Sequence, residues 1–285
     1  MNRFSETKKA GILGILGNIF LLVIKFSIGF ITKSQAMIAD GANSAGDIFA
    51  SLMTYIGNKI ASEPQDDSHN FGHGKAEYIF SMFISISMII VALRLLIGSF
   101  CSLILQEYME FSWFLVIVCI VTIVIKFSLY IYTNKLSKKY DNILLIANRD
   151  DHRNDCIVTS FTLLSVLATL IGIYWLDGVV GIGISAWIAY TGVKIFIESY
   201  NVLMDKSLDE ETKNRIIDLI SKNENVKSVI SINTIPVGYQ YIVVLTIAVD
   251  GNLSTFDSHK LADKLENKIT SIDKIYNTII HVEPK

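Results

Sequence analysis

The chain is poor in charged residues. Lysine, arginine, aspartate and glutamate make up 18% of its 285 residues, whereas about a quarter of a typical soluble domain is charged. Hydrophobic residues make up 51% of the chain, and the mean hydropathy is +0.45. This deficit of charge excludes an ordinary soluble protein and predicts an integral membrane protein with room for a modest soluble domain.

Several functional signatures are also missing. The net charge is −2, so the composition offers no basic surface to a nucleic acid partner. Cys101, Cys119 and Cys156 lie in or beside apolar runs without a Cys-x-x-Cys pair, which favours small core residues over metal ligands or a disulfide. The chain has no nucleophile elbow, Walker loop or dinucleotide fingerprint. We therefore expect neither an enzyme nor an organic cofactor.

Six segments are candidates for membrane-spanning helices, each of which needs about 20 mostly apolar residues. They cover approximately residues 9–31, 36–60, 76–100, 112–134, 145–172 and 176–200. The second and fifth are the weakest, because they carry acidic clusters that a bundle accepts only where neighbouring helices exclude lipid. Lys25, Arg94 and Lys126 also fall within spans, where each either reaches toward the membrane surface or pairs with a carboxylate.

Positive charge marks the expected orientation in the membrane. Lysine and arginine occur mainly in four segments: 1–9, 59–75, 135–142 and the residues after 200. The positive-inside rule then places both termini in the cytoplasm, and an even number of spans agrees with this. The first apolar run lacks a small-residue cleavage site, so we interpret it as a membrane helix rather than a signal. Without a histidine-rich loop or targeting extension, a bacterial-type plasma membrane is expected.

The composition changes beyond about residue 206. The pattern there predicts a helix over 209–222, strands over 226–235 and 239–250, a helix over 255–271 and a strand over 276–282. This αββαβ order indicates a ferredoxin-like or metallochaperone-like α+β domain, with its helices on one face of a three-stranded sheet. We expect a six-helix transmembrane domain over residues 1–205 and a cytoplasmic regulatory and dimerisation domain over 206–285.

Two of the spans carry oxygen-bearing side chains on one helical face. Asp151 and Asp155 are four residues apart, Asn43 and Asp47 are also four apart, and Asp40 shares the stripe of the second pair. A carboxylate inside a membrane requires a partner, a water-filled cavity or a bound cation. Two such helices suggest a divalent-cation site, with a structural network of caps and hydrogen bonds as the alternative.

These features together resemble the cation diffusion facilitator family. The resemblance rests on six spans, the acidic pairs, the segment His-Asn-Phe-Gly-His-Gly-Lys-Ala-Glu at 69–77, Leu-Met-Asp at 203–205, and the αββαβ tail. It covers essentially the whole chain. It implies a homodimeric exporter of divalent metal ions that works by proton antiport with alternating access.

The resemblance assigns the transport site to Asn43, Asp47, Asp151 and Asp155. Zinc exporters of the family usually have His or Asp at the first position and His at the third, whereas this chain offers oxygen alone. Zinc favours nitrogen and sulfur, while carboxylate and carbonyl oxygens suit manganese and other hard ions. The set resembles the manganese-transporting branch, so Mn²⁺ is the expected cargo, and Zn²⁺, Fe²⁺ and Co²⁺ remain alternatives.

Two neighbouring residues leave details of this site open. His152 follows Asp151 at about 100° around the helix, and a shift in register would bring it into the site and restore zinc affinity. Asp40 either lines the exit path or caps its helix. Because crowded carboxylates repel one another, we expect one of Asp47, Asp151 and Asp155 to hold a proton in the outward-facing empty site, which metal binding displaces.

The loop between the second and third spans carries two further assignments from the resemblance. Asp66, His69 and His73 match a metal site of the family, with a solvated polar loop as the alternative. Lys75 and Asp205 match a salt bridge that fixes geometry near the membrane.

The tail carries a third group, in which His259, His281 and Glu283 match ligands of regulatory sites in zinc-type members. Ile230 and Thr246 stand where those members have two more histidines, so a full binuclear site is not expected, and a weaker site or none remains.

A metal sensor or scaffold that does not transport is the alternative from another class. The intact acidic set argues against it, because a scaffold has no need of charges in the bilayer.

Overall fold

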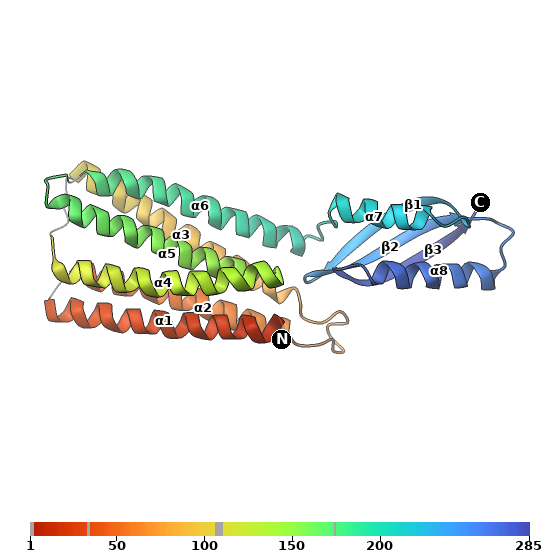
Figure 1. Ribbon diagram of the computed structural model, residues 1–285, viewed down its shortest axis with the longest axis horizontal. Helices are drawn as coiled ribbons and strands as arrows, with labels where there is room; N and C mark the ends of the chain where they lie inside the picture. Colours follow the sequence, from red (N-terminus) through yellow and green to blue (C-terminus); the bar gives the residue numbers. More distant parts are fainter. Residues whose placement is uncertain (1–2, 33–34, 106–110, 174) are drawn as a thin grey trace. The chain divides into compact units, whose positions relative to one another are not determined.

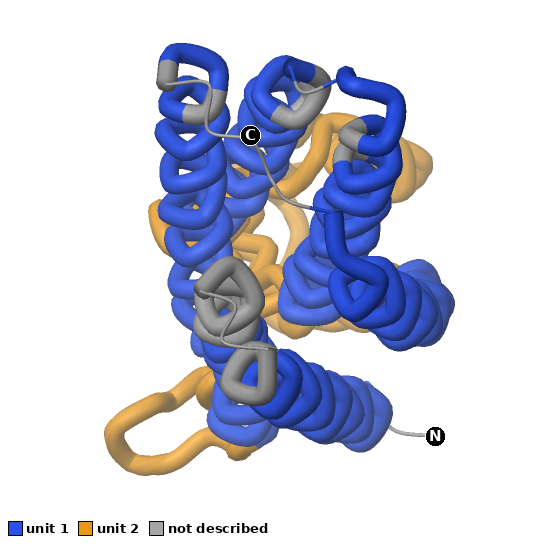
Figure 2. The backbone as a smooth tube through the Cα atoms, turned by 90° about the vertical axis from the view of Figure 1, so that its left-hand side faces the viewer, with its two compact units in different colours: residues 1–62, 76–200 blue, residues 63–75, 201–285 orange. Residues whose placement is uncertain are grey.

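The computed structural model describes residues 3–32, 35–105, 111–173 and 175–285. Within these ranges, nothing is described of the side chains of residues 29–32, 35–43, 102, 105, 165, 169, 176, 177 and 180. The chain forms two compact units (Figure 2). Unit 1 comprises residues 1–62 and 76–200, and unit 2 comprises residues 63–75 and 201–285.

Six long helices that run alongside one another form unit 1 (Figure 1). They are α1 (Arg3–Thr32), α2 (Gln35–Ala61), α3 (Ala76–Leu105), α4 (Trp113–Tyr140), α5 (Ile143–Thr169) and α6 (Leu176–Leu203). By length and composition alone, the described parts of α1, α3 and α4 are apolar enough to cross a membrane. The other three helices do not meet this criterion within the described residues, and two of them, α2 and α5, carry the acidic clusters.

Local sequence determines where α5 begins. The backbone of Asp141 turns to a φ of 46° after α4. The side-chain oxygen of Asn142 then accepts hydrogen bonds from the backbone N–H groups of Leu144 and Leu145, at 2.8 and 3.3 Å. This is an N-cap, which satisfies N–H groups that have no partner inside the helix. Asn142 Nδ2 also donates to Glu77 Oε1 at 3.1 Å, which connects the start of α5 to α3.

Small residues allow close packing between the helices. A Cβ atom at Gly14 on α1 would lie only 2.6 Å from Ser51 Oγ on α2, so this pair of helices approaches closely because Gly14 has no side chain. An apolar core joins α2, α3, α5 and α6, and its buried members are Ala50, Ile84, Met88, Ala92, Ile143, Leu144, Ala147, Ile184, Ile188 and Ile195. These contacts place α2 and α5 in the same part of the bundle.

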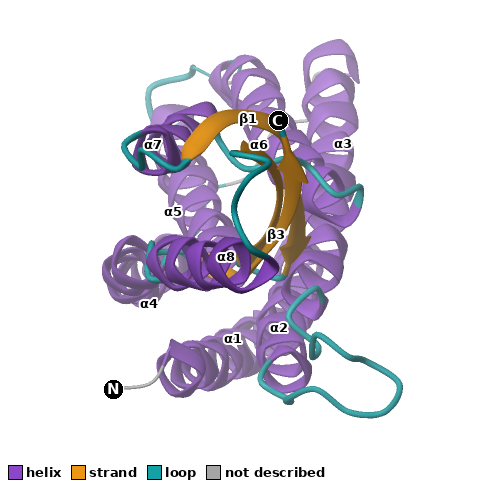
Figure 3. Ribbon diagram, turned by 90° about the vertical axis from the view of Figure 1, so that its right-hand side faces the viewer, coloured by secondary structure: helices purple, strands orange, loops and turns teal. Residues whose placement is uncertain are grey.

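Unit 2 contains the predicted αββαβ order. Its elements are α7 (Glu210–Ser221), β1 (Val226–Val237), β2 (Gln240–Val249), α8 (Thr255–Thr270) and β3 (Ile275–Pro284). The sheet has the order β1-β2-β3, with β1 antiparallel and β3 parallel to β2. Figure 3 shows both helices on the same face of the sheet. Between them lies a buried core that includes Ile216, Ile220, Val243, Leu245, Ile247, Leu265 and Ile269. The predicted fold class is confirmed.

The loop of residues 63–75 belongs to unit 2 although it connects two helices of unit 1. Gly74 lies against the β1–β2 turn, where a Cβ atom added to Gly238 would be 2.9 Å from the Gly74 carbonyl carbon. Gly238 also has a φ of +81°, which favours glycine. The Lys75 ammonium donates to Asp205 Oδ1 at 2.9 Å, and this is the pair that the family resemblance assigned to a salt bridge. Sequence patterns alone did not group this loop with the tail.

Candidate metal transport site

Three expected ligand residues line one cavity in unit 1. Asp47 on α2 and Asp151 and Asp155 on α5 border a space of about 330 Å³. The remaining lining residues come from α2, α3, α5 and α6, and they are Gly46, Ser87, Met88, Val91, Arg94, Leu95, Asn154, Val158 and Ile188. The structure therefore brings carboxylates from two helices, more than 100 positions apart in the sequence, to a single mainly apolar space.

A lysine from a third helix contacts these carboxylates. The Lys126 ammonium on α4 donates to Asp47 Oδ2 at 2.8 Å and also to Asp155 Oδ2. The Lys126 side chain is 1% exposed. A buried ammonium requires such partners, because its removal from water is otherwise costly. Of the two outcomes that the sequence left open for Lys126, pairing with a carboxylate is the one observed.

His152 lies beside the cavity rather than among the residues that line it. Its ring is completely buried, and neither ring nitrogen has a hydrogen-bond partner. A Cβ atom at Gly14 on α1 would lie 3.6 Å from His152 Nε2, so the ring lies near the α1 helix. Nevertheless, one ligand atom each from Asp151, His152 and Asp155 fall within 4.8 Å of one another. Asp151 borders the cavity and the His152 ring lies beside it, so the choice of ligand between them stays a prediction.

Four further residues from the sequence analysis have separate outcomes. The side chains of Asn43 and Asp40 lie outside the described residues, although both positions fall within α2. Lys25 is buried, and its ammonium donates to Ser44 Oγ at 3.1 Å. Arg94 is exposed on the cavity wall.

The arrangement is suited to a divalent cation with oxygen ligands. The three carboxylates outnumber the Lys126 ammonium, which contacts two of them, and the Arg94 guanidinium on the cavity wall, so the group is negative when all three are ionised. Asp151 Oδ2 is buried and has no hydrogen-bond partner. Buried polar atoms are normally paired, and an unpaired one requires an explanation such as an ion or water. The carboxylate oxygens at this mainly apolar cavity are the ligands that hard divalent ions prefer.

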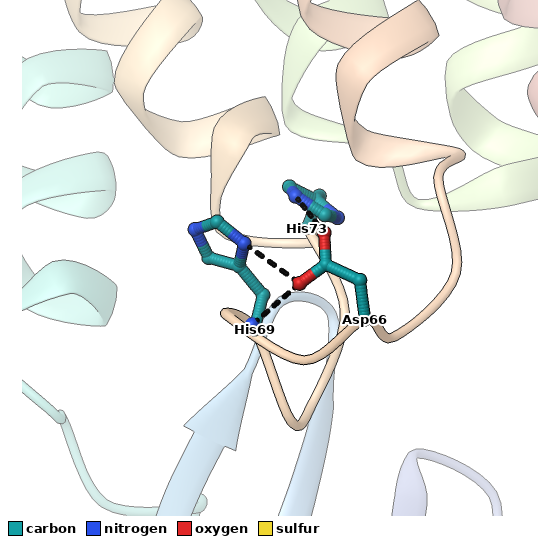
Figure 4. A group of neighbouring side chains, drawn as sticks. All are labelled: Asp66, His69 and His73. Atoms are coloured by element: carbon teal, nitrogen blue, oxygen red, sulfur yellow. Dashed lines mark hydrogen bonds and ion pairs between the residues drawn. The ribbon is translucent and has the colours of Figure 1, made fainter.

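The loop residues Asp66, His69 and His73 converge at the surface of unit 2 (Figure 4). His69 Nδ1 lies 3.2 Å from Asp66 Oδ1, and His73 Nε2 lies 3.6 Å from Asp66 Oδ2. The backbone N–H of His69, 2.6 Å from Asp66 Oδ1, holds the pKa of that carboxyl below its usual range. The carboxylate therefore stays ionised near neutral pH, as a metal ligand must be. Metal binding here remains a prediction.

The three tail residues do not form a comparable cluster among the described residues of one chain. His259 on α8 lies 3.6 Å from Asp263, its neighbour one turn away, while His281 and Glu283 on β3 lie 3.8 Å apart. All three are exposed. A metal site in the tail therefore also remains a prediction.

Comparison with known proteins decides the family. The model of the cation efflux transmembrane domain matches residues 11–204, and the model of the cation efflux protein cytoplasmic domain matches residues 208–285. The chain belongs to the cation efflux, or cation diffusion facilitator, family. It is therefore an integral membrane transporter for the efflux of divalent cations and not an enzyme. The match to the family's dimerising cytoplasmic domain supports a homodimer.

Relatives in this family match along almost the full chain. An uncharacterized transporter of Methanocaldococcus jannaschii is 32% identical over 98% of this chain and 98% of its own length. The manganese efflux system proteins MneP and MneS of Bacillus subtilis are each 28% identical. MneP matches over 98% of this chain and 96% of its own length, and MneS over 100% and 99%.

At this cavity, sequence reasoning left two residues without a role. Lys126 was recognised as a cation inside a span, but its partners depend on which helices are neighbours, and a single sequence does not reveal this. Asn154 lines the cavity, and both its amide atoms are buried without hydrogen-bond partners. The available signal was its position directly before Asp155, in the only densely polar stretch of the fifth span.

Proposed function

We propose that this transporter exports Mn²⁺ through a site formed by Asn43, Asp47, Asp151 and Asp155. The observation that carries the proposal is the cavity, in which three carboxylates from two helices meet and whose described lining residues include no cysteine. Such ligands suit manganese better than zinc. The two manganese efflux relatives at 28% identity support the same cargo.

Transport assays in proteoliposomes test this proposal. The parent chain should move Mn²⁺ faster than Zn²⁺, and Asp151→His should raise Zn²⁺ transport at the expense of Mn²⁺, because it adds a nitrogen ligand. Asp218→His is the matched control, since that carboxylate is exposed on α7. A parent chain that already prefers Zn²⁺ would contradict the assignment of the cargo.

Proton antiport is the proposed energy source. When the metal leaves, several carboxylates remain in a confined apolar space, and proton uptake relieves their mutual repulsion. An imposed pH gradient across the proteoliposome membrane should therefore drive Mn²⁺ against its concentration gradient. Transport that does not respond to the gradient would exclude this coupling.

Zn²⁺ is the second candidate cargo, and His152 is the observation that favours it. Its unpartnered ring nitrogens lie within reach of Asp151 and Asp155. If His152 is a ligand, His152→Gln should abolish transport of Zn²⁺. If Mn²⁺ is the cargo and Asp151 the ligand, the same substitution should leave most transport intact.

The orientation of the chain completes the proposal. We infer that both termini and unit 2 lie in the cytoplasm of a bacterial-type cell, with the protein in the plasma membrane. The distribution of lysine and arginine supports this orientation. Cysteine labelling from either side of the membrane, at a position introduced after residue 280, tests it.

A further inference from the structure

One fully buried cation contacts the proposed site from a helix to which no ligand is assigned. Lys126 on α4 bridges Asp47 on α2 and Asp155 on α5. Burial of an ammonium inside an apolar bundle is costly, and contact with carboxylates compensates for its lost hydration. The contact thus holds the two cargo ligands together and neutralises part of their charge.

The position of Lys126 differs from that of the cavity residues. Asp47 and Asp155 both border the cavity, whereas Lys126 is not among its lining residues and is 1% exposed. An ion in the cavity and the ammonium therefore reach the same carboxylates from different sides. Both positive charges draw on the same negative charge, so each weakens the attraction that the other experiences.

We propose that Lys126 is a resident counter-cation that lowers the affinity of the transport site for its divalent cargo. This inference rests on the proposed function, since it takes Asp47 and Asp155 as cargo ligands. A transport site must bind its ion firmly enough to load and weakly enough to release it. Lys126 shifts this balance toward release. It acts through the carboxylates, so it is a positioning residue and not a ligand.

Lys135 provides an internal comparison. It lies on α4, as Lys126 does, but its side chain is exposed. Removal of Lys135 deletes one positive charge from the same helix while it leaves the bridge between Asp47 and Asp155 in place. A role specific to Lys126 therefore predicts unequal effects of the two substitutions.

The test measures Mn²⁺ binding to the purified full-length protein by titration calorimetry. Lys126→Gln should lower the Kd at least about tenfold, because a positive charge next to the ligands is removed. Lys126→Arg, which keeps the charge, and Lys135→Gln should each change the Kd less than threefold. Weaker binding by Lys126→Gln, or an equal gain for Lys135→Gln, would overturn the proposal.

Transport kinetics separate this role from a structural one. In proteoliposomes, Lys126→Gln should lower both KM and kcat, because tighter binding slows release. If Lys126 only supported the fold, its replacement would lower kcat and leave KM unchanged or raised. A kcat that falls without a fall in KM would therefore overturn the proposal.

Two further measurements cover poor folding and a different cargo. If Lys126→Gln cannot be purified, Mn²⁺ binding to Lys126→Arg is the deciding measurement. The guanidinium keeps the positive charge and holds carboxylates at least as firmly as an ammonium does. Tighter Mn²⁺ binding by Lys126→Arg would overturn the proposal. If the parent binds Zn²⁺ but not Mn²⁺, the proposed cargo is wrong. The Lys126 comparison is then repeated with Zn²⁺ and supports or overturns the inference independently.

Discussion

At the scale of the single residue, Asp155 has two roles in the structure, as a partner of Lys126 and as part of the cavity wall. Its carboxylate accepts a hydrogen bond from Lys126 and also borders the cavity between the helices. Asp151 borders the same cavity, but its Oδ2 has no hydrogen-bond partner. The two carboxylates on one face of α5 therefore differ in their described hydrogen bonds.

Replacement of Asp155 by asparagine should abolish most transport. The change removes a negative ligand while it keeps the size of the side chain, and it leaves Lys126 with Asp47 as its one carboxylate partner among the contacts described. We expect the initial rate of Mn²⁺ uptake to fall at least about a hundredfold. Replacement of a residue that only hydrogen-bonds to a metal ligand usually causes a smaller loss. Asp218→Asn, on an exposed face of α7, serves as the control. A variant that retained half the parent's rate would exclude Asp155 as a ligand.

The sequence predicted which residues share one face of a helix, but it did not predict which helix faces pack against each other. The spacing of four residues put Asp151 and Asp155 on one stripe, and the structure places both at the cavity. Lys126 is 29 residues from Asp155 in the sequence. Its partnership depends on α4 packing beside α5, which follows from side-chain fit along two helices and not from a pattern within either one.

At the scale of the element, caps set the helix boundaries in both units. Asn142 caps the N-terminus of α5, Asp209 caps that of α7, and Ser254 caps that of α8. The backbone N–H of Thr212 donates to Asp209 Oδ1 at 2.8 Å, and this bond lowers the pKa of Asp209. The sequence located α7 to within one residue at each end, because the acidic residues at its start and the apolar stripe indicate the same limits.

Loss of the Asp209 cap should loosen the start of α7. Asp209→Ala should cost about 1 kcal/mol of local stability, which appears as roughly fivefold faster amide hydrogen exchange in the first turn. In the parent, a carboxyl with a lowered folded-state pKa stabilises the helix at pH values above its unfolded-state pKa of about 3.9. That contribution disappears as the pH falls through the folded-state pKa.

The cap of α8 provides the matched control. Ser254→Ala should increase exchange in the first turn of α8 and leave α7 unchanged. Equal exchange in α7 of the parent and the Asp209→Ala variant at neutral pH would show that the cap contributes nothing.

At the scale of the whole molecule, unit 2 is assembled from two separate parts of the chain. The loop of residues 63–75 joins residues 201–285 through the Gly74–Gly238 contact and the Lys75–Asp205 pair. Sequence reasoning predicted the αββαβ tail correctly, because each of its elements has a local signature. It proposed the Lys75–Asp205 pair only through the family resemblance, since no local pattern links residues so far apart.

Alanine at position 238 should release the loop from the β1–β2 turn. The substitution adds a Cβ at a φ of +81° and within 2.9 Å of Gly74, and the strained backbone alone costs about 1–2 kcal/mol. Hydrogen exchange across residues 63–75 should accelerate, and any metal affinity of Asp66, His69 and His73 should fall. Gly251→Ala is the control, because its nearest neighbour would be 3.6 Å away. Unchanged exchange in the loop would mean that the contact does not hold it.

The divided unit also has a consequence for biosynthesis. Asp205 follows Lys75 by 130 positions, and Gly238 comes later still. A ribosome therefore completes all six helices of the bundle before it supplies the residues that fasten the loop. A nascent chain arrested before the β1–β2 turn would carry the loop without its Gly238 contact. Protease sensitivity of residues 63–75 would thus report how far translation has progressed.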